Sequence, residues 1–170
     1  EQGPAPSPLQ PTRLLDFVAR APGCIGQPAD AVSAYTQALL YGDGRTAPVD
    51  TWISPPPDQQ PPSWRKYRNP VCGLRLALYG HPLSGVFWGR HCDAKLCEEG
   101  WDLIDGWGNL YVNRRLGLTL SVYVDDFKMA GLARNMAKCW CTITKHIKLD
   151  APTPLGDYRG CGQRDADLTP

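Results

Sequence analysis

Residues 118–131 constrain the fold of this chain more than any other stretch, because their pattern predicts a β-hairpin. From Leu118 to Val124, Leu and Val alternate with Thr, Ser and Tyr, which is the period of a strand with one buried face. Asp tolerates the left-handed backbone of tight turns, so Asp125-Asp126 is expected to form the turn before a second strand over residues 127–131. Two adjacent carboxylates beside apolar packing repel each other, and a divalent cation is the simplest counter-charge. Because an Asp-Asp pair is also an ordinary polar turn, the metal-site hypothesis depends on the rest of the chain.

The length and composition indicate one folded domain. A chain of 170 residues with 42% hydrophobic residues and six Trp can bury one core, but it is short for two domains. A net charge of +1 does not mark the whole chain as a nucleic-acid binder. Seven scattered Cys without a signal-peptide pattern predict reduced thiols in an intracellular protein that is not secreted. No apolar run reaches the length of a membrane span, so no membrane partner is expected.

Apolar spacing, interrupted by Pro and Gly, predicts the order of the elements. We expect an extended lead-in over residues 1–11, a helix over 12–21, a strand over 24–32, a helical turn over 33–40, strands at 51–54 and 71–78, a helix over 84–99, strands at 101–104 and 110–112, the hairpin, and a helix over 132–147. This order predicts an α+β domain in which an antiparallel sheet carries helices packed on one face.

Asp30 lies where the first strand gives way to the helical turn. An Asp in this position either caps the helix or faces a cleft, and the sequence leaves both interpretations open. Pro28 is awkward in the same strand, because proline has no amide to donate to a central ladder position.

A Pro-rich loop over residues 55–70 carries Arg65, Lys66 and Arg68 beside Trp64 and Tyr67. The loop is expected either to be solvated, with aromatic anchors, or to contact a phosphate backbone.

Four short motifs occur in a fixed order along the chain. They are Ala29-Asp30-Ala31-Val32-Ser33-Ala34-Tyr35; Leu76-Ala77-Leu78-Tyr79-Gly80 with Ser84 and Trp88; Tyr123-Val124-Asp125-Asp126; and Gly156-x-Tyr158-x-Gly160. In this order and with these separations, over about residues 13–163, they resemble the palm region of copia-type retrotransposon reverse transcriptases.

The resemblance implies an α+β reverse-transcriptase palm with incomplete fingers and no thumb. The lead-in would cover residues 1–11, the partial palm domain residues 12–163, and a tail residues 164–170. The chain would then be a segment of the Pol polyprotein, an RNA-directed DNA polymerase, in a cytoplasmic particle or the nucleus. It is expected to be inactive in isolation.

The resemblance also implies the site residues. Asp30, Asp125 and Asp126 would be the catalytic, metal-binding carboxylates, holding two Mg²⁺ ions, or Mn²⁺, for transfer of a nucleotide from a dNTP to a primer 3′-hydroxyl. The partners would be an RNA or DNA template with its primer, the dNTP and the rest of the Pol polyprotein. The substrate-binding residues would be Ala34, Tyr35 (whose ring would crowd a ribose 2′-hydroxyl), Tyr79, Gly80, Ser84, Tyr123 and Val124.

Two alternatives to an active polymerase segment remain open: a non-catalytic remnant and a phosphohydrolase. The chain is either such a polymerase segment or a truncated, decayed and non-catalytic remnant of one. A small magnesium-dependent phosphohydrolase would use the same carboxylates, but the sequence nominates no clear His or Lys to activate water.

Overall fold

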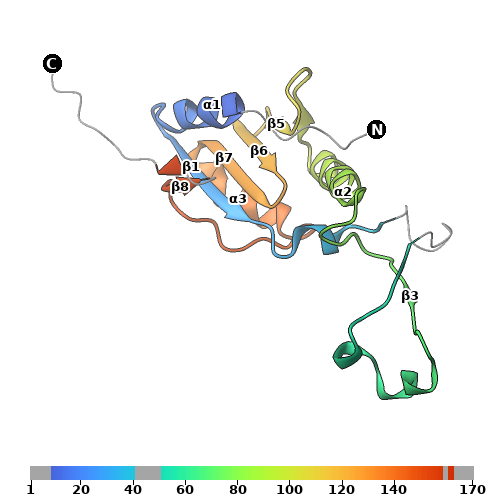
Figure 1. Cartoon of the computed structure of the whole chain (residues 1–170). Coiled ribbons are helices and arrows are strands. Elements are labelled where there is room, and N and C mark those ends of the chain that lie inside the picture. Colours follow the sequence, from blue (N-terminus) through green and yellow to red (C-terminus); the bar gives the residue numbers. More distant parts are fainter. Residues whose placement is uncertain (1–8, 41–50, 159–160, 163–170) are drawn as a thin grey trace.

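The structure, a computed structural model, describes residues 9–40, 51–158 and 161–162 (Figure 1). The α-helices are α1 (Leu9–Ala19), α2 (Ser84–Glu98) and α3 (Ala133–Ile143), and the 3₁₀ helices are η1 (Ala34–Gln37), η2 (Pro57–Gln59) and η3 (Pro62–Lys66). The strands are β1 (Cys24–Asp30), β2 (Trp52–Ile53), β3 (Cys72–Gly73), β4 (Asp102–Leu103), β5 (Leu110–Asn113), β6 (Leu118–Tyr123), β7 (Asp126–Leu132), β8 (Asp157–Tyr158) and β9 (Cys161–Gly162). Among the described residues, no helix combines the length and the apolar character needed to cross a membrane.

Five of the strands form one antiparallel sheet in the order β1-β7-β6-β5-β4. The β6–β7 hairpin lies inside this sheet, because β7 pairs with β6 on one side and with β1 on the other. The α+β class, the antiparallel sheet and the central hairpin are therefore confirmed.

The hairpin turn lies one residue earlier than predicted. Tyr123 pairs with Asp126 as the last rung of the ladder, so the two turn residues are Val124 and Asp125. Val124 adopts a left-handed backbone with φ +54°, which tight two-residue hairpin turns require. Asp126 is the first residue of β7 rather than a turn residue.

The helices cover both faces of the sheet, so the prediction of helices on one face is wrong for α1. Successive strand residues point to opposite faces. Phe127 and Met129 of β7 join the cluster formed with α2 and α3, whereas Ala130 packs with Leu15 and Ala19 of α1. Lys128 also points toward α1, where it forms an ion pair with Asp16.

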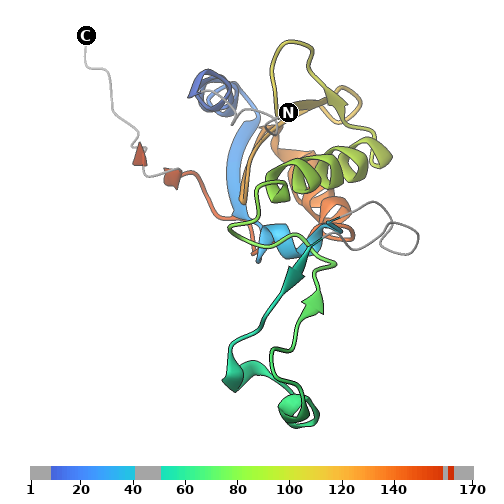
Figure 2. The same cartoon turned by 45° about the vertical axis from the view of Figure 1, so that its right-hand side comes forward.

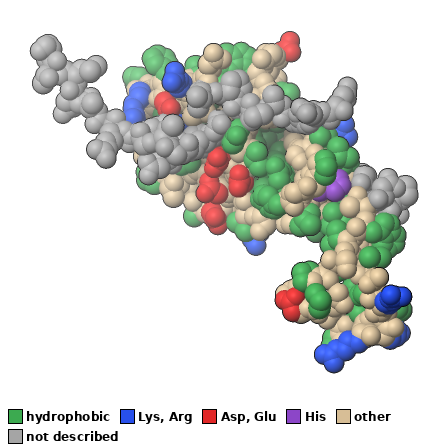
Figure 3. Space-filling model, in the orientation of Figure 1, with side chains coloured by type: hydrophobic (Ala, Val, Ile, Leu, Met, Phe, Trp, Pro, Cys, Tyr) green, Lys and Arg blue, Asp and Glu red, His purple; other side chains and the backbone are tan. Residues whose placement is uncertain are grey.

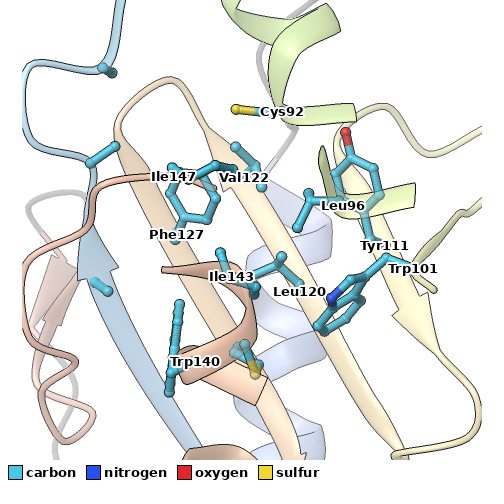
Figure 4. Close-up of a cluster of buried hydrophobic side chains, with 14 of the residues drawn as sticks. Cys92, Leu96, Trp101, Tyr111, Leu120, Val122, Phe127, Trp140, Ile143 and Ile147 are labelled. Atoms are coloured by element: carbon cyan, nitrogen blue, oxygen red, sulfur yellow. The ribbon is translucent and has the colours of Figure 1, made fainter. Parts of the chain in front are cut away.

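The larger core fills the space between the sheet and helices α2 and α3 (Figure 4). Figure 4 shows Leu96 of α2 and Ile143 of α3 reaching toward Leu120 and Phe127 of the central hairpin. Trp101, between α2 and β4, is 1% exposed and closes one side of the cluster. This packing fixes α2 against the end of the hairpin that carries the acidic residues.

Strand β1 is an edge strand, and this position accommodates Pro28. Among the described strands its neighbour is β7 alone, so an amide is not needed on the outer side of the strand. Backbone carbonyls of β1 accept two hydrogen bonds from the segment after α3: Thr153 N–H donates to Pro28 at 3.0 Å and Asp150 N–H to Asp30 at 2.8 Å.

Several element boundaries differ from the predicted ones. Helix α1 begins at Leu9, inside the predicted lead-in, because Pro11 is tolerated in a first turn where its missing amide has no partner to lose. Only η1 forms within residues 33–40, and only β3 within 71–78. The segment after α3 ends in β8 and β9, which pair with each other rather than with the sheet. Residues 1–8 of the lead-in, Gly160 of the fourth motif and the tail 164–170 lie outside the described residues.

Residues 51–75, called the arm below, project from the body of the molecule (Figure 2). Strands β2 and β3 pair in the arm, and helices η2 and η3 lie between them in the sequence.

Candidate active site

Asp30 and Asp126 face each other across two neighbouring strands. Asp30 ends β1, Asp126 begins β7, and the two residues are direct partners in the antiparallel register. Direct partners on antiparallel strands point to the same face, with Cβ atoms about 5 Å apart. The backbone also links β1 to the hairpin turn, since Ala31 N–H donates to the Asp125 carbonyl at 2.7 Å. The fold thus places the backbones of the three acidic residues that the sequence nominated next to one another.

The carboxylates lie where water and ligands can reach them. Asp30 and Asp125 are exposed, and Asp126 is partly buried. Like charges placed directly opposite each other on a sheet are destabilising unless a cation compensates them. In the part of the chain that the structure describes, no Lys or Arg forms an ion pair with Asp30 or Asp125. A bound cation would relieve this repulsion.

The donor set fits magnesium held only in part by protein. The described residues contain no group of three or more His, Cys, Asp and Glu side chains arranged to enclose a metal ion. Mg²⁺ typically takes one or two carboxylates and completes its octahedron with water and substrate phosphate oxygens. Asp30 and Asp126 supply two facing carboxylates of this kind, with Asp125 on the adjoining turn.

A cleft of about 240 Å³ opens beside the hairpin turn. Its walls come from η1, from α2 and from strands β5 and β6, and they include Tyr35, Gly85, Trp88, Val122, Tyr123 and Val124. Three residues that the sequence predicted to bind substrate therefore share one cleft: Tyr35, Tyr123 and Val124.

Helix α2 holds the hairpin turn in place through Trp88. The indole N–H of Trp88 donates to the carbonyl of Val124 at 2.6 Å, and Trp88 is 3% exposed. This bond fixes the residue with the left-handed backbone, which immediately precedes Asp125. The position of the acidic turn thus depends on a residue of a separate helix.

Tyr35 contacts Tyr79 and lies near Asp125 of the hairpin turn. Its ring centroid is 4.5 Å from that of Tyr79, with the planes inclined at 47°. Burial raises the pKa of the Tyr35 hydroxyl, and electrostatic interactions with Tyr79 and with the Asp125 carboxylate raise it further. The hydroxyl is therefore protonated at neutral pH.

The side chains of Ala34 and Ser84 face the interior instead. Ala34 is 0% exposed and Ser84 1% exposed. The Ser84 hydroxyl donates to the Leu78 carbonyl at 2.7 Å and accepts from the Leu78 amide at 2.9 Å. Ser84 thereby closes the loop that presents Tyr79, which is 52% exposed, and Gly80, whose φ is +90°. Contact of Ala34 or Ser84 with a substrate would have to involve their backbone.

Sequence reasoning missed the two glycines of α2 that line the cleft, Gly85 and Gly89. A Cβ at Gly85 would lie 4.0 Å from the Tyr35 hydroxyl oxygen, so the missing side chain leaves room beside that ring. The sequence pattern that could have identified these two glycines is their i, i+4 spacing, which puts both on one face of the helix.

Comparisons with protein-family models, with curated proteins and with solved structures gave no match for this chain.

Proposed function

We propose that the chain is the palm segment of a copia-type RNA-directed DNA polymerase, with Asp30, Asp125 and Asp126 as its catalytic carboxylates. The observation that carries the proposal is the pairing of Asp30 with Asp126, reinforced by the hydrogen bond from Ala31 to the Asp125 carbonyl. Two motifs far apart in the sequence thereby form one acidic site.

In this proposal the carboxylates bind the metal ions, and the surrounding elements keep the carboxylates in register. Bound magnesium would supply Lewis-acid stabilisation of the charge on the attacking and leaving oxygens of the nucleotidyl transfer. Asp30 and Asp126 are positioned by the β1–β7 ladder, and Asp125 by the turn that Trp88 anchors. Rigid placement of the reacting groups is the protein's main contribution to such a transfer.

Tyr35 would select the sugar of the incoming nucleotide. Its ring packs against Tyr79, and it lies near enough to Asp125 for that carboxylate to raise its pKa. A ribose 2′-hydroxyl directed at this ring would meet carbon atoms rather than water, which favours a deoxyribose. Tyr123 and Val124 border the same cleft and are assigned to the primer end.

The cleft lining also favours a second candidate, a non-catalytic remnant of such a polymerase. Among the residues that the structure describes, those that line the cleft include neither Lys nor Arg. The charge of a triphosphate would therefore have to be balanced by metal ions or by other parts of a Pol polyprotein. Catalysis by this chain alone is accordingly expected to be weak or absent.

Metal binding tests the carboxylate assignment without requiring catalysis. Calorimetric titration with Mg²⁺ and with Mn²⁺ should reveal millimolar or tighter binding that is lost in Asp30→Asn and in Asp126→Asn. Asp105→Asn is the matched control, because Asp105 is an exposed carboxylate in the loop between β4 and β5. Equal binding by all three variants would refute the assignment.

Primer extension separates the two candidates. A primed RNA template with dNTPs and Mn²⁺ should be extended by the chain once it is joined to fingers and thumb domains, and not by the same fusion carrying Asp125→Asn. Metal binding that depends on Asp30 and Asp126 but is accompanied by no extension would favour the non-catalytic remnant.

A further inference from the structure

The arm is a stiff projection whose geometry is fixed by proline and by local hydrogen bonds. Residues 51–75 contain six prolines, each of which fixes a backbone φ angle. The Ser54 hydroxyl donates to the Pro70 carbonyl at 3.1 Å, and the Gln60 side-chain amide donates to Pro55 at 2.7 Å. A surface that is already ordered loses little conformational entropy when it binds a partner.

The arm also concentrates the positive charge of the chain. It contains four Lys or Arg residues and one carboxylate, Asp58, which gives a net charge of 4 − 1 = +3. The whole chain carries +1, so the remainder carries 1 − 3 = −2. Figure 3 shows basic side chains at the far end of the arm and a group of acidic side chains on the body. The near-neutral total thus conceals two regions of opposite sign.

Three cations of the arm are close in the sequence to an exposed aromatic residue, Tyr67. Arg65, Lys66 and Arg68 are exposed and flank Tyr67 in the sequence. Lys66 Nζ lies 5.1 Å from the centroid of the Tyr67 ring, which is 56% exposed. Among the residues that the structure describes, none forms an ion pair with these three cations. Trp52, at the base of the arm, is 62% exposed.

We propose that the arm binds a single-stranded nucleic acid, with Arg65, Lys66 and Arg68 on phosphates and Tyr67 stacked on a base. Single strands are bound by cations that follow the backbone and by aromatic rings on which unpaired bases stack. A duplex keeps its bases stacked internally, and an acidic peptide or an anionic membrane would use the cations but offers no base for the ring. The proposal does not depend on the carboxylate site, because it concerns a different part of the molecule.

Fluorescence anisotropy with labelled single strands of about 12 nucleotides, oligo(U) and oligo(dT), measures the binding. The triple variant Arg65→Gln, Lys66→Gln, Arg68→Gln removes three phosphate contacts. At about 0.1 M salt this variant should bind at least tenfold more weakly than the unmodified chain. Counterion release from three phosphate contacts sets an upper limit of about 100-fold on the loss. The slope of log K against log salt should become shallower by about 2, which is 0.7 for each of three contacts.

A matched triple variant controls for net charge. Arg134→Gln, Lys138→Gln, Lys145→Gln removes three exposed cations from α3 and the residues after it, on the body of the molecule. It should retain both the affinity and the salt slope of the unmodified chain. Equal losses in the two triple variants would overturn the proposal, as would failure of the unmodified chain to bind either oligonucleotide.

The Tyr67→Leu variant tests the class of partner. Loss of one stacked base should weaken binding about 5- to 150-fold while leaving the salt slope unchanged. A duplex of the same length, a poly-glutamate peptide and phosphatidylserine-containing vesicles should each bind more weakly than the single strands. Tighter binding of any of these three, or an unchanged affinity of Tyr67→Leu for single strands, would refute the assignment. Asp125→Asn should bind single strands normally, which separates this result from a failure of the polymerase proposal.

Discussion

The ion pair between Lys128 and Asp16 ties helix α1 to the sheet, and its two members should respond unequally to mutation. The Lys128 side chain is 0% exposed, whereas the Asp16 side chain is 30% exposed. Removing the carboxylate leaves an ammonium group in the interior without this counter-charge. Removing the ammonium leaves a carboxylate that water already reaches, so the cost should be much smaller.

The burial difference sets the expected magnitudes. Breaking a buried pair by removing one partner costs about 3–5 kcal/mol, and the partial exposure of Asp16 lowers this to about 2–4 kcal/mol for Asp16→Ala. For a chain of this size, the melting temperature should fall by about 5–15 °C. Lys128→Met replaces the buried cation with an apolar side chain of similar length, and it should cost less than about 1 kcal/mol.

Urea unfolding of the two single variants and of the double variant measures this asymmetry. The double variant should be about as stable as Lys128→Met alone, because Asp16 has little to contribute once the cation is gone. Lys95→Met is the control, because it breaks an ion pair on the surface. The side chain of Lys95 is 32% exposed and that of its partner Glu98 is 52% exposed, so the substitution should cost less than about 0.5 kcal/mol. A Lys128→Met variant that loses as much stability as Asp16→Ala would refute the reasoning.

Three further predictions concern the hairpin and the thiols. Trp88→Phe removes the indole hydrogen bond to the turn and part of a buried ring, so the free energy of unfolding should fall by about 2–3 kcal/mol; an unchanged urea midpoint would contradict this. Gly131→Ala should fail to fold, or should lose more than about 3 kcal/mol, because φ is +139° and a Cβ would overlap the Gly117 carbonyl oxygen; a native circular dichroism spectrum and melting curve would disprove the clash. Burial raises the pKa of the Cys139 thiol to about 11, which leaves little thiolate at pH 8. During alkylation at this pH, mass spectrometry should therefore find the exposed Cys141 modified before Cys139. Equal alkylation rates of the two thiols would contradict the burial of Cys139.

The central hairpin was the most predictable part of the fold, because its period-2 pattern is local. The turn was misplaced because register, rather than turn propensity, decided it: pairing of Tyr123 with Asp126 leaves Val124 and Asp125 as the two loop residues. Val is a poor candidate for a left-handed backbone, so residue preferences alone favour the wrong pair.

The convergence of Asp30 on the hairpin could be expected only from the resemblance. It depends on pairing between β1 and β7, whose residues are distant in the sequence, and no local pattern specifies that register. The structure brings Asp30 opposite Asp126, whereas the metal roles of the carboxylates and the substrate roles of Tyr35 and Tyr79 stay predictions.

The location of α1 could not be predicted from its own pattern, since an apolar stripe does not specify which face of a sheet it covers. The available clue was Lys128, a cation within an otherwise apolar strand. A buried cation requires a carboxylate on whatever covers it, and Asp16 of α1 is that carboxylate.

Strand β1 is an edge strand of the sheet, and it contains a proline. Two of its backbone carbonyls already accept hydrogen bonds from the segment after α3. A strand that lacks an amide and has its acceptors occupied is a poor template for another chain. Self-association through continuous intermolecular sheets, the usual route to fibrils, is therefore disfavoured at the edge strand that carries Asp30. Replacing Pro28 with a residue that carries an amide would weaken this protection, even where the monomer keeps its stability.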